Sequence, residues 1–589
     1  MHGFYNRILT IDLSARSFDI ENISDEILAE CFGGKGLATR LLLDRNPQGV
    51  EPFAPENNFI IATGPFCGGR LWGGSRFGVY TKSPLTGYYA ESYSGGKVPE
   101  SIDSTGFDAI IVSGRSERPT VLSIHPDGVD FCDGTELWGL ETFLAEEEAV
   151  KRFAPNKEGF RKPGAIVIGP AGENLVKFAI IANDKWRCAG RTGVGAVLGS
   201  KRVKALVFQG DRKREYSDPD GVAEYAKAFS KTNFDQPGVK AYRKLGTTMM
   251  VSLMNHAGAL PTKYWSRGTW EHAESISGET YHEEHKVTPH ACAKCFMACG
   301  RLTTISKGRR KGLELEGPEY ETIYSFGSLC MIKEMEEVAY LNDLCDRIGI
   351  DTITAGNLCA LLMEAKEQGR IEYEIEYGNA DQVIELIEKI GSRSEIGNVL
   401  ADGIIAVSEK FGLEDLAIHV KGLEPAGYDP RTLKGMGLTF GTAPRGACHL
   451  RTTFYKPELA GLIAPDQIEN KAEMLIDYED RLNIFDTLTL CRFYRDLYSW
   501  EELVKILELV TGSTRTEQEL RKIAAKIATM TRQFNIREGL KAKDDRLPRR
   551  FHKEALPEGG TLSEADMEYM LQDYYELRGW NDQGVPITE

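Results

Sequence analysis

The chain is long and acidic. It has 589 residues, 42% of them hydrophobic and 27% charged, and its formal net charge is −16. This composition is typical of about two to four globular domains, and the negative charge disfavours a nucleic-acid binder. No run approaches the roughly 18 consecutive apolar residues of a membrane span, and the N-terminus lacks a basic region followed by an apolar one. We therefore expect no membrane insertion and no signal peptide, and place the protein in the cytoplasm. Its 12 cysteines are too sparse for a disulfide scaffold.

The first domain, residues 1–209, is predicted to be rich in β-strands. Short apolar runs bounded by Gly, Pro, Asp and Asn are typical of strands. They are RILTIDLS, NFIIATGP, RFGVYTKS, DAIIVSGRS, PTVLSIHPDGVDFCDG, GAIVIGP, KFAIIAND and KALVFQG. No regular alternation of strands with helices accompanies them, so the pattern favours an α+β fold over a doubly wound one. The polar segment GDRKREYSDPDG, residues 210–221, is the best candidate for a linker.

Helical periodicity dominates the rest of the chain, which we divide into domains at 210–412 and 413–589. Apolar residues recur near the 3.6-residue period in eight segments. They are GVAEYAKAFSKT, EMEEVAYLNDLCDRIG, TAGNLCALLMEAKEQG, DQVIELIEKIG, NKAEMLIDYEDRLNIFDTLTLC, WEELVKILELVTG, TEQELRKIAAKIATMTRQFNIREG and LSEADMEYMLQDYYELRGW. Both later domains are therefore expected to be mainly α-helical.

Three cysteines lie close together near the middle of the chain. Cys292, Cys295 and Cys299 form a C-x2-C-x3-C run. Such a group of thiolates needs a metal to neutralise it, and a [4Fe–4S] cluster commonly takes several cysteines from one loop and one from far away. A structural zinc site would need a second cysteine pair or a histidine pair, and radical SAM enzymes use the reversed order C-x3-C-x2-C. The spacing favours an iron–sulfur cluster, and leaves Cys330, Cys345, Cys359, Cys448 and Cys491 as candidates for the fourth ligand.

Two short acidic motifs occupy corresponding places in the helical domains. DRIGID runs from Asp346 to Asp351, and DTLTLC runs from Asp486 to Cys491. A carboxylate before a tight turn can accept two hydrogen bonds from an amino-pyrimidine edge. Each motif alone is more simply a helix end.

Two glycine-rich loops are suited to phosphate. CAGRTGVGAVLGSK, residues 188–201, contains Arg191 but fits neither the Walker A nor the dinucleotide-binding spacing. GGSRFG holds Arg76 between Gly74 and Gly78. Backbone N–H groups of such loops can approach phosphate closely.

An acid–base group is predicted from two distant segments. EGPEYET supplies Tyr320 and Glu321, and PRGACHLRTTF supplies His449. Together they could act on a carbonyl, although each alone is more often structural. The segments HEEH (282–285) and KGRRKG (307–312) are interpreted as solvated loops.

With these residues together, the sequence resembles the aldehyde ferredoxin oxidoreductase family of tungsten enzymes. The resemblance rests on C-x2-C-x3-C, D-x-x-G-x-D, D-x-x-x-L-C, GPEYET, AGRTGVGAVLGSK and FGGKGLATRLL, and it covers essentially the whole chain. It implies an N-terminal cofactor-binding domain of paired β-sheets followed by two mainly helical domains. It also implies tungsten or molybdenum held by two pterins, which a magnesium ion joins through their phosphates.

The resemblance assigns roles to particular residues. Cys292, Cys295, Cys299 and Cys491 would hold a [4Fe–4S] cluster, and Glu321, Tyr320 and His449 would face the substrate. The cofactor-binding residues would be Arg76, Tyr93, Gly95, Asn183, Arg191, Gly193, Asp346, Ile350, Asp351, Asp486, Leu490 and Cys491, with Arg76 and the 190–195 loop on the pterin phosphates.

The chain departs from the family pattern at two positions. Tyr93 stands where the family usually has Asn, which is tolerable if that position binds magnesium through its backbone carbonyl. Thr192 stands in place of a Gly, so we expect it to have a negative φ.

The implied activity is oxidation of an aldehyde by water, with electrons leaving through the cluster to ferredoxin or an iron–sulfur partner subunit. A basic docking face would contain Arg301, Lys307, Arg309, Arg310 and Lys311. A homodimer or a hetero-oligomer is compatible with this. An alternative in the same superfamily is a tungsten reductase of an aromatic acyl-CoA thioester, for which Cys330 is the cysteine to inspect as a metal ligand. A zinc-stapled or radical SAM protein is a more distant alternative.

Overall fold

Two six-stranded sheets form the N-terminal part of the protein in this computed structural model, which describes residues 1–587. The first sheet has the order β2-β1-β6-β3-β4-β5 and the second β11-β10-β9-β12-β7-β8. The strands are β1 (Arg7–Asp12), β2 (Ser17–Asn22), β3 (Phe59–Ala62), β4 (Phe77–Lys82), β5 (Tyr89–Ser94), β6 (Ala109–Ser113), β7 (Thr120–His125), β8 (Gly128–Asp133), β9 (Gly164–Val167), β10 (Ile181–Asn183), β11 (Arg187–Ala189) and β12 (Val203–Phe208). All eight predicted strand segments contain strands, and the predicted α+β class is confirmed.

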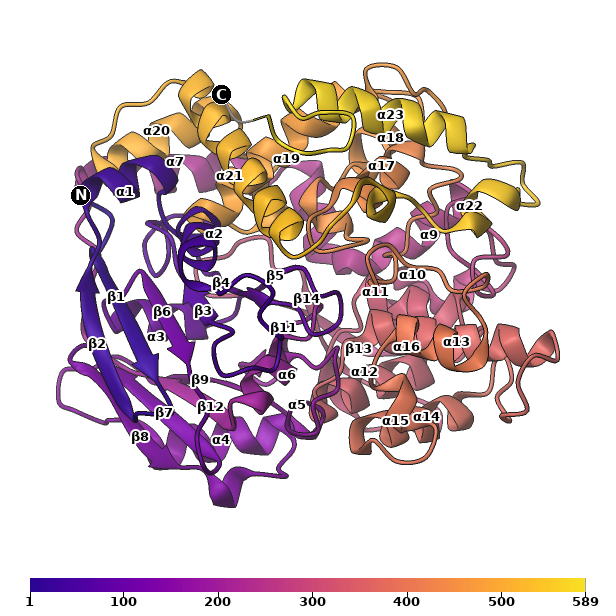
Figure 1. The fold of residues 1–589 in the computed structure, drawn as a ribbon, viewed down its shortest axis with the longest axis horizontal. Coiled ribbons are helices and arrows are strands. Elements are labelled where there is room, and N and C mark those ends of the chain that lie inside the picture. The colour runs from indigo at the N-terminus through magenta and orange to yellow at the C-terminus, as the bar shows by residue number, and fades with distance from the viewer. Residues whose placement is uncertain (588–589) are drawn as a thin grey trace.

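The two sheets pack face to face because their strands alternate. Leu9 and Ile11 of β1 point into a core shared with Leu206 and Phe208 of β12. Ile8, directly before Leu9 in β1, points to the opposite face and joins a second core under the C-terminal helices. Alternate side chains of a strand lie on opposite faces, so one strand serves both cores. Figure 1 shows the sheets side by side at one end of the molecule.

Helices form the rest of the molecule. The longer ones after the sheets are α7 (Pro219–Asn233), α8 (Pro237–Leu245), α12 (Met335–Ile348), α13 (Thr352–Glu367), α14 (Ala380–Ser392), α17 (Lys434–Thr442), α19 (Lys471–Leu488), α20 (Trp500–Thr511), α21 (Glu517–Arg537) and α23 (Glu564–Leu577). All eight predicted helical segments lie in these helices. Helix α19 packs against α2 (Gly34–Arg45), α21 and α23, so it joins the N-terminal sheets to the C-terminal helices. None of the helices described is both long and apolar enough to cross a membrane.

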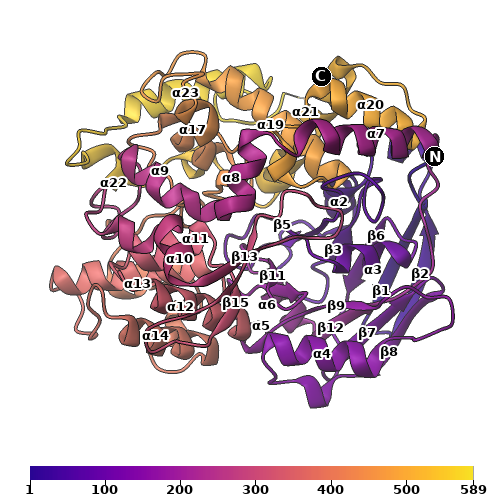
Figure 2. The ribbon, with the colours of Figure 1, turned by 180° about the vertical axis from the view of Figure 1, so that it is seen from behind.

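The predicted linker is fixed against the rest of the protein. Arg214 is buried and its guanidinium pairs with Asp103 and Asp108, each at 2.7 Å. Further along, the Ser217 N–H donates to the Val510 carbonyl at 3.0 Å. These contacts bring α7 alongside α20 on the back of the molecule (Figure 2). The segment is therefore rich in polar residues partly because Arg214 forms buried ion pairs, and not only because it is exposed to solvent.

A small antiparallel sheet holds the cysteine run. It consists of β13 (Lys286–His290), β14 (Gly300–Thr304) and β15 (Glu314–Glu316). Cys292, Cys295 and Cys299 lie in the connection between β13 and β14. This placement presents the three thiols on one hairpin loop.

Candidate active site

One cavity of about 400 Å³ collects residues from all three predicted domains. The predicted site residues that line it are Arg76, Tyr93, Gly95, Arg191, Cys292, Cys295, Cys299, Tyr320, Glu321, Asp346, Ile350, Asp351, His449, Asp486, Leu490 and Cys491. Asn183 and Gly193 are not among its lining residues. Groups that are far apart in the sequence thus share one space.

The cysteine hairpin and Cys491 are joined through the backbone of Gly73. The Gly73 N–H donates to the Lys294 carbonyl at 3.1 Å, and the Gly73 carbonyl accepts from the Cys491 N–H at 2.8 Å. Of the five candidates for a fourth ligand, Cys491 is the one that lines the cavity within the described residues 1–587. The fold therefore brings together the four cysteines that the resemblance assigns to the cluster.

Arg76 lies among these cysteines. Its Nη2 donates to Cys491 Sγ at 3.3 Å. Burial lowers the pKa of Arg76, but the Cys491, Cys292 and Cys299 thiolates raise it above its ordinary value. The sequence placed Arg76 at a phosphate, whereas its contacts in the structure are with the cysteine group.

The two acidic motifs share a backbone geometry. Asp346 lies in the last turn of α12, which ends at the left-handed Gly349 (φ +88°). Asp486 lies in the last turn of α19, which ends at the left-handed Thr489 (φ +61°). In each case the Asp precedes the capping residue by three positions, so each motif is a helix end. Both Asp residues also line the cavity.

The electrostatic surroundings of the two motifs differ. Asp486 pairs with Arg451 at 3.2 Å and with Arg492. Asp346 accepts from Asn342 Nδ2 at 2.9 Å and from Cys188 Sγ at 3.4 Å, and no basic residue pairs with it among residues 1–587. Burial raises the pKa of Asp346 well above its usual range. One motif therefore presents a charged carboxylate within arginines, and the other a carboxyl that burial favours as neutral.

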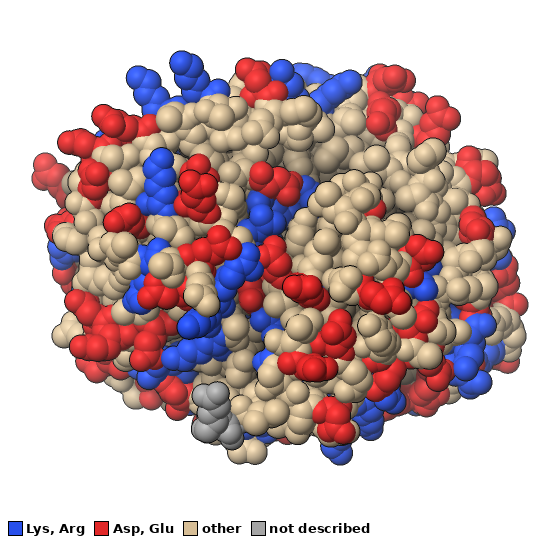
Figure 3. All heavy atoms as spheres, turned by 90° about the horizontal axis from the view of Figure 1, so that it is seen from above, with Lys and Arg blue, Asp and Glu red and all other residues tan. Residues whose placement is uncertain are grey.

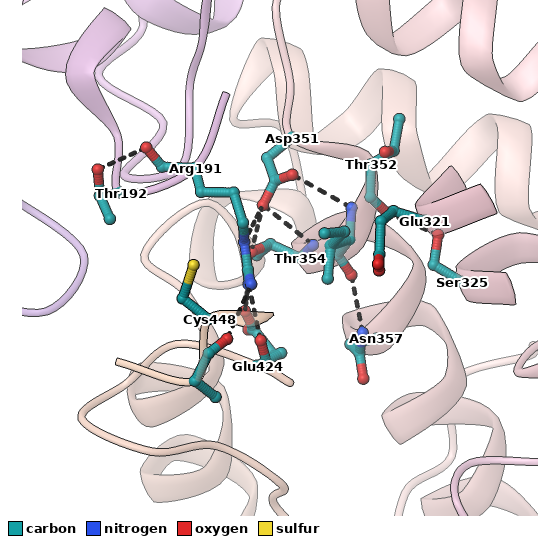
Figure 4. A network of polar contacts seen from close by, with 12 residues as sticks. Arg191, Thr192, Glu321, Ser325, Asp351, Thr352, Thr354, Asn357, Glu424 and Cys448 are labelled. Atoms are coloured by element: carbon teal, nitrogen blue, oxygen red, sulfur yellow. Dashed lines mark hydrogen bonds and ion pairs between the residues drawn. The ribbon is translucent and has the colours of Figure 1, made fainter. Parts of the chain in front are cut away.

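The 190–195 loop is tied to both helical regions by Arg191 (Figure 4). Its Nε donates to Asp351 Oδ2 at 3.3 Å and its Nη2 to the Glu424 carbonyl at 2.8 Å. Asp351 also caps α13 by accepting from the Thr354 N–H at 3.3 Å. Arg191 thus holds the loop against the first acidic motif.

The expectation for Thr192 was wrong. Its φ is +72°, in the left-handed region, and Gly193 follows with φ +76°. A side chain at Gly193 would collide with the Lys177 carbonyl. The Thr192 carbonyl accepts from Ser83 Oγ at 2.8 Å, and the Thr192 side chain donates to the Arg191 carbonyl. The surrounding contacts hold a backbone conformation that costs a non-glycine residue about 1–3 kcal/mol.

The Tyr93 side chain interacts with three neighbouring side chains. Its hydroxyl donates to Glu91 Oε2 at 2.6 Å, and its ring lies 5.2 Å from the Arg451 guanidinium and 5.3 Å from that of Arg492. The backbone nearby has its own partner: the Gly95 carbonyl accepts a hydrogen bond from Asn183 Nδ2 at 2.9 Å.

Glu321 and His449 form a buried pair. Glu321 Oε1 lies 3.3 Å from His449 Nε2, and Oε2 accepts from the Gly427 N–H at 3.0 Å. Burial raises the pKa of Glu321 to about 8. Burial, reinforced by Arg191 and other arginines, lowers the pKa of His449 well below its ordinary value. At neutral pH the pair is therefore mainly a protonated carboxyl beside a neutral imidazole.

Aromatic side chains line the cavity beside this pair. Tyr428 stacks on Tyr455 with ring centroids 4.2 Å apart, and Tyr428 lies 5.3 Å from His449. The Tyr320 hydroxyl donates to the Gly427 carbonyl. Tyr320 thus fixes the backbone whose N–H holds Glu321.

Sequence reasoning missed an arginine cluster that consists of Arg445, Arg451 and Arg492. Arg445 Nη2 donates to Cys448 Sγ at 2.9 Å, and Arg451 also pairs with Glu91 at 2.5 Å. These arginines stand within or directly beside the quoted segments, so their position next to motif residues was an available signal.

The predicted docking face is not present as described. Arg301 is 1% exposed and donates to the Arg243 and Lys244 carbonyls at 2.9 and 2.8 Å. Arg309 and Arg310 both pair with Glu337, at 2.6 and 3.0 Å. Arg301 is therefore buried, and Arg309 and Arg310 are paired with a carboxylate. Of the two lysines of the predicted face, Lys307 pairs with Glu284 at 2.6 Å and Lys311 is exposed. Figure 3 shows the same mixing of charges on another face.

The segment HEEH is not a solvated loop. Its first three residues end α10 (Gly278–Glu284), and His285 is buried. His285 Nδ1 accepts from the Ser306 N–H at 3.2 Å. These histidines are therefore structural.

The cavity is suited to the implied cofactors. Arg445 Nε, Arg451 Nε and Nη2, and His449 Nδ1 are buried without hydrogen-bond partners in the described part of the chain. A Cβ at Gly95 would lie 2.9 Å from Cys292 Sγ, so the backbone there approaches the cysteines closely. Unpartnered buried donors beside a four-cysteine group match an anionic pterin and an iron–sulfur cluster.

Comparison with known proteins agrees with this geometry. Residues 8–210 match the family described as aldehyde ferredoxin oxidoreductase, N-terminal domain, and residues 224–589 match domains 2 and 3 of that family. The chain is 34% identical to the tungsten-containing aldehyde ferredoxin oxidoreductase of Pyrococcus furiosus, over 99% of this chain and 97% of the relative. It is 35% identical, with the same coverage, to the enzyme of that name from Thermococcus kodakarensis.

A solved structure shares the fold. It is the active site complex BamBC of benzoyl coenzyme A reductase in complex with 1,5 dienoyl-CoA, with a TM-score of 0.83 and 22% identity. The alignment covers 99% of this chain and 96% of that one. On the family matches and the identity to the tungsten enzymes, this chain belongs to the aldehyde ferredoxin oxidoreductase family.

Proposed function

We propose that this protein oxidises aldehydes to carboxylic acids and passes the electrons to an iron–sulfur carrier. The balanced reaction is RCHO + H2O → RCOOH + 2 H⁺ + 2 e⁻, with each electron reducing one acceptor of the ferredoxin class. The observation that supports it best is the Glu321–His449 pair in the same cavity as both acidic motifs and the four cysteines.

The family resemblance supplies the cofactor assignment, and the residues around the cavity are compatible with it. Asp346, Asp351 and Asp486 would hold two pterins, and Cys292, Cys295, Cys299 and Cys491 would hold a [4Fe–4S] cluster. Magnesium between the pterin phosphates would lie near Tyr93, Gly95 and Asn183. The pterin-bound tungsten or molybdenum would supply a Lewis acid and a two-electron sink.

The Glu321–His449 pair would move protons. When Glu321 is ionised, His449 Nε2–H can donate to it, and the free oxygen lone pairs can accept a proton from water. A protonated Glu321 can donate its O–H to Nε2 only when His449 is in the Nδ1–H tautomer, so passing between the two arrangements requires the imidazole to give its Nε2 proton to water and take one from water at Nδ1. Nδ1 is buried and has no partner among residues 1–587, so it is available to donate to the substrate or product oxygen.

Electrons would leave through the cysteine group. Cys491 directly follows Leu490 at the second acidic motif, and Arg76 connects it to the cavity wall. Cys292, Cys295 and Cys299 are half-buried, and Lys294 between them is exposed. We therefore expect the carrier to dock near the β13–β14 loop and not at Arg309 and Arg310.

The test uses protein purified without oxygen. Metal analysis should find about one tungsten or molybdenum and about four iron per chain, as the proposed cofactor and cluster require. Aldehyde-dependent reduction of a viologen dye and of ferredoxin should follow in the same preparation. Zinc alone, or full metal content without oxidation of aliphatic, aromatic or sugar aldehydes, would refute the proposal.

The acyl-CoA reductase alternative receives no support from Cys330. Its side chain is buried, and Sγ donates to the Ser325 and Gly356 carbonyls at 3.2 and 3.3 Å. It is not among the residues that line the cavity. The shared fold with the benzoyl-CoA reductase complex supports architecture only. A thioester included in the activity assay distinguishes the two reactions.

A further inference from the structure

Arg495 is a buried arginine without an acidic partner. It is 1% exposed and follows the short helix η6 (Arg492–Tyr494). Among the described residues, no Asp or Glu lies within ion-pair distance of its guanidinium. The adjacent Asp496 pairs with Lys456 instead. Buried charges are normally paired, so this one requires an explanation.

One edge of the Arg495 guanidinium makes no hydrogen bonds. Nη1 donates to the Arg492 carbonyl at 2.7 Å. Nε and Nη2 are buried and have no partner among the residues described. These two nitrogens form the edge that receives both oxygens of a carboxylate side-on. The backbone contact through Nη1 therefore leaves a fixed two-donor edge available.

This arginine lines the same cavity as Glu321 and His449. Tyr455 lines the cavity with both groups, and its ring lies 6.5 Å from that of His449. Burial lowers the pKa of Arg495, but Tyr455, Tyr242 and the adjacent Asp496, which lies beyond ion-pair distance, raise it above its ordinary value. The aromatic rings of Tyr428, Tyr455 and Tyr242 thus separate the proton-transfer pair from a permanent positive charge.

Other carboxyl groups of the cavity do not neutralise this charge. Glu316 pairs with Arg187 at 2.5 Å, and Glu319 accepts from Thr247 Oγ1. Glu321 lies with His449 and the Gly427 N–H. Each has partners of its own away from Arg495.

Resting on the proposed aldehyde oxidation, we propose that Arg495 determines substrate specificity by binding the carboxylate of a bifunctional aldehyde. The carbonyl would lie at Glu321 and His449, the connecting carbons against Tyr428 and Tyr455, and the distant carboxylate on Nε and Nη2 of Arg495. The preferred substrate class is therefore a small aldehyde that carries a carboxylate, with an aromatic or short aliphatic connection.

The experiment compares two aldehydes that differ only in the distant charge. Wild-type holoenzyme should oxidise 4-formylbenzoate with a kcat/KM about 10- to 100-fold above that of benzaldehyde, the range expected for a charged, two-donor contact. Arg495→Met should remove this preference and leave benzaldehyde within about twofold. Arg495→Lys should restore part of it, because it keeps the charge but not the fork. Arg481→Met is the control: Arg481 lies over Tyr478 and does not line the cavity, so the preference should stay unchanged.

A binding measurement separates the possible failures. Calorimetry on the holoenzyme should show terephthalate, the dicarboxylate product, binding at least tenfold more tightly than benzoate, and Arg495→Lys should reduce this difference. If wild type oxidises both aldehydes equally and binds both acids equally, the assignment of Arg495 is refuted and the proposed function stands. If no aldehyde is oxidised but terephthalate still binds through Arg495, the proposed function fails and the anion site remains. If Arg495→Met does not fold, the wild-type preference and Arg495→Lys decide the question.

Discussion

Glu321 should control the pH dependence of aldehyde oxidation. Burial raises its pKa to about 8, although the Gly427 N–H lowers it. A general base must be ionised to take a proton, so about a tenth of the molecules are competent at pH 7 and about nine-tenths at pH 9. We therefore expect kcat/KM to rise roughly tenfold between pH 7 and pH 9.

The perturbation is Glu321→Gln. Glutamine retains the size and can still accept from the Gly427 N–H, but it cannot take a proton. The variant should lose about 10²- to 10⁴-fold in kcat/KM, and its residual rate should lack the rise with pH. Steady-state kinetics from pH 6 to 10, on preparations matched for metal content, measure both effects.

Glu146→Gln is the matched control. Burial raises the pKa of Glu146 to about 7, and this residue lies outside the cavity, where it accepts from the Asp184 and Lys185 N–H groups at 2.7 Å. The control should keep both the rate and its pH profile. A flat wild-type profile, or a Glu321→Gln variant within tenfold of wild type, would refute the assignment of Glu321 as the base.

Further predictions concern the cluster and the stability of the fold. Cys491→Ser should lose cluster iron, measured by iron content and electron paramagnetic resonance, and an intact cluster would contradict the ligand assignment. Arg214→Met should lower the free energy of unfolding by about 3–5 kcal/mol, measured in denaturant, because it leaves Asp103 and Asp108 buried without a cation. Cys330→Ala should keep its tungsten or molybdenum, and loss of that metal would revive the reductase alternative. The apoprotein should lose stability as pH rises from about 4.5 to 8, in part because Glu321 keeps its proton in the native state but not in the unfolded one, and Glu321→Gln should remove the Glu321 share of that loss.

Sequence patterns revealed most of the strands that have a buried face, although the largely buried β5 was missed. β3 and β12 consist of apolar and β-branched residues in the core, and their periodicity is clear. β2, with the sequence SFDIEN, is an exposed edge strand. It was missed because its polar composition is typical of a loop. Its pairing with β1 depends on neighbours that no local pattern encodes.

The site could be predicted in part for a similar reason. The spacing of the cysteines and of the Asp residues is visible in the sequence. These residues of the cavity wall could therefore be predicted before the shape of the cavity was known. The burial of Arg301 and the left-handed backbone of Thr192 depend on carbonyls and hydroxyls from distant segments. A charge run or a loop sequence does not contain that information.

The discontinuous wall of the cavity has a consequence for biosynthesis. Its lining begins at Gly73 and ends at Arg495, and α19 positions the last contributions against the N-terminal sheets. A nascent chain that has emerged only as far as the cysteine hairpin holds three thiols but lacks Asp486 and Cys491. Cofactor loading therefore belongs after translation of nearly the whole polypeptide, and chains that end before Cys491 should be unable to retain either the metal or the cluster.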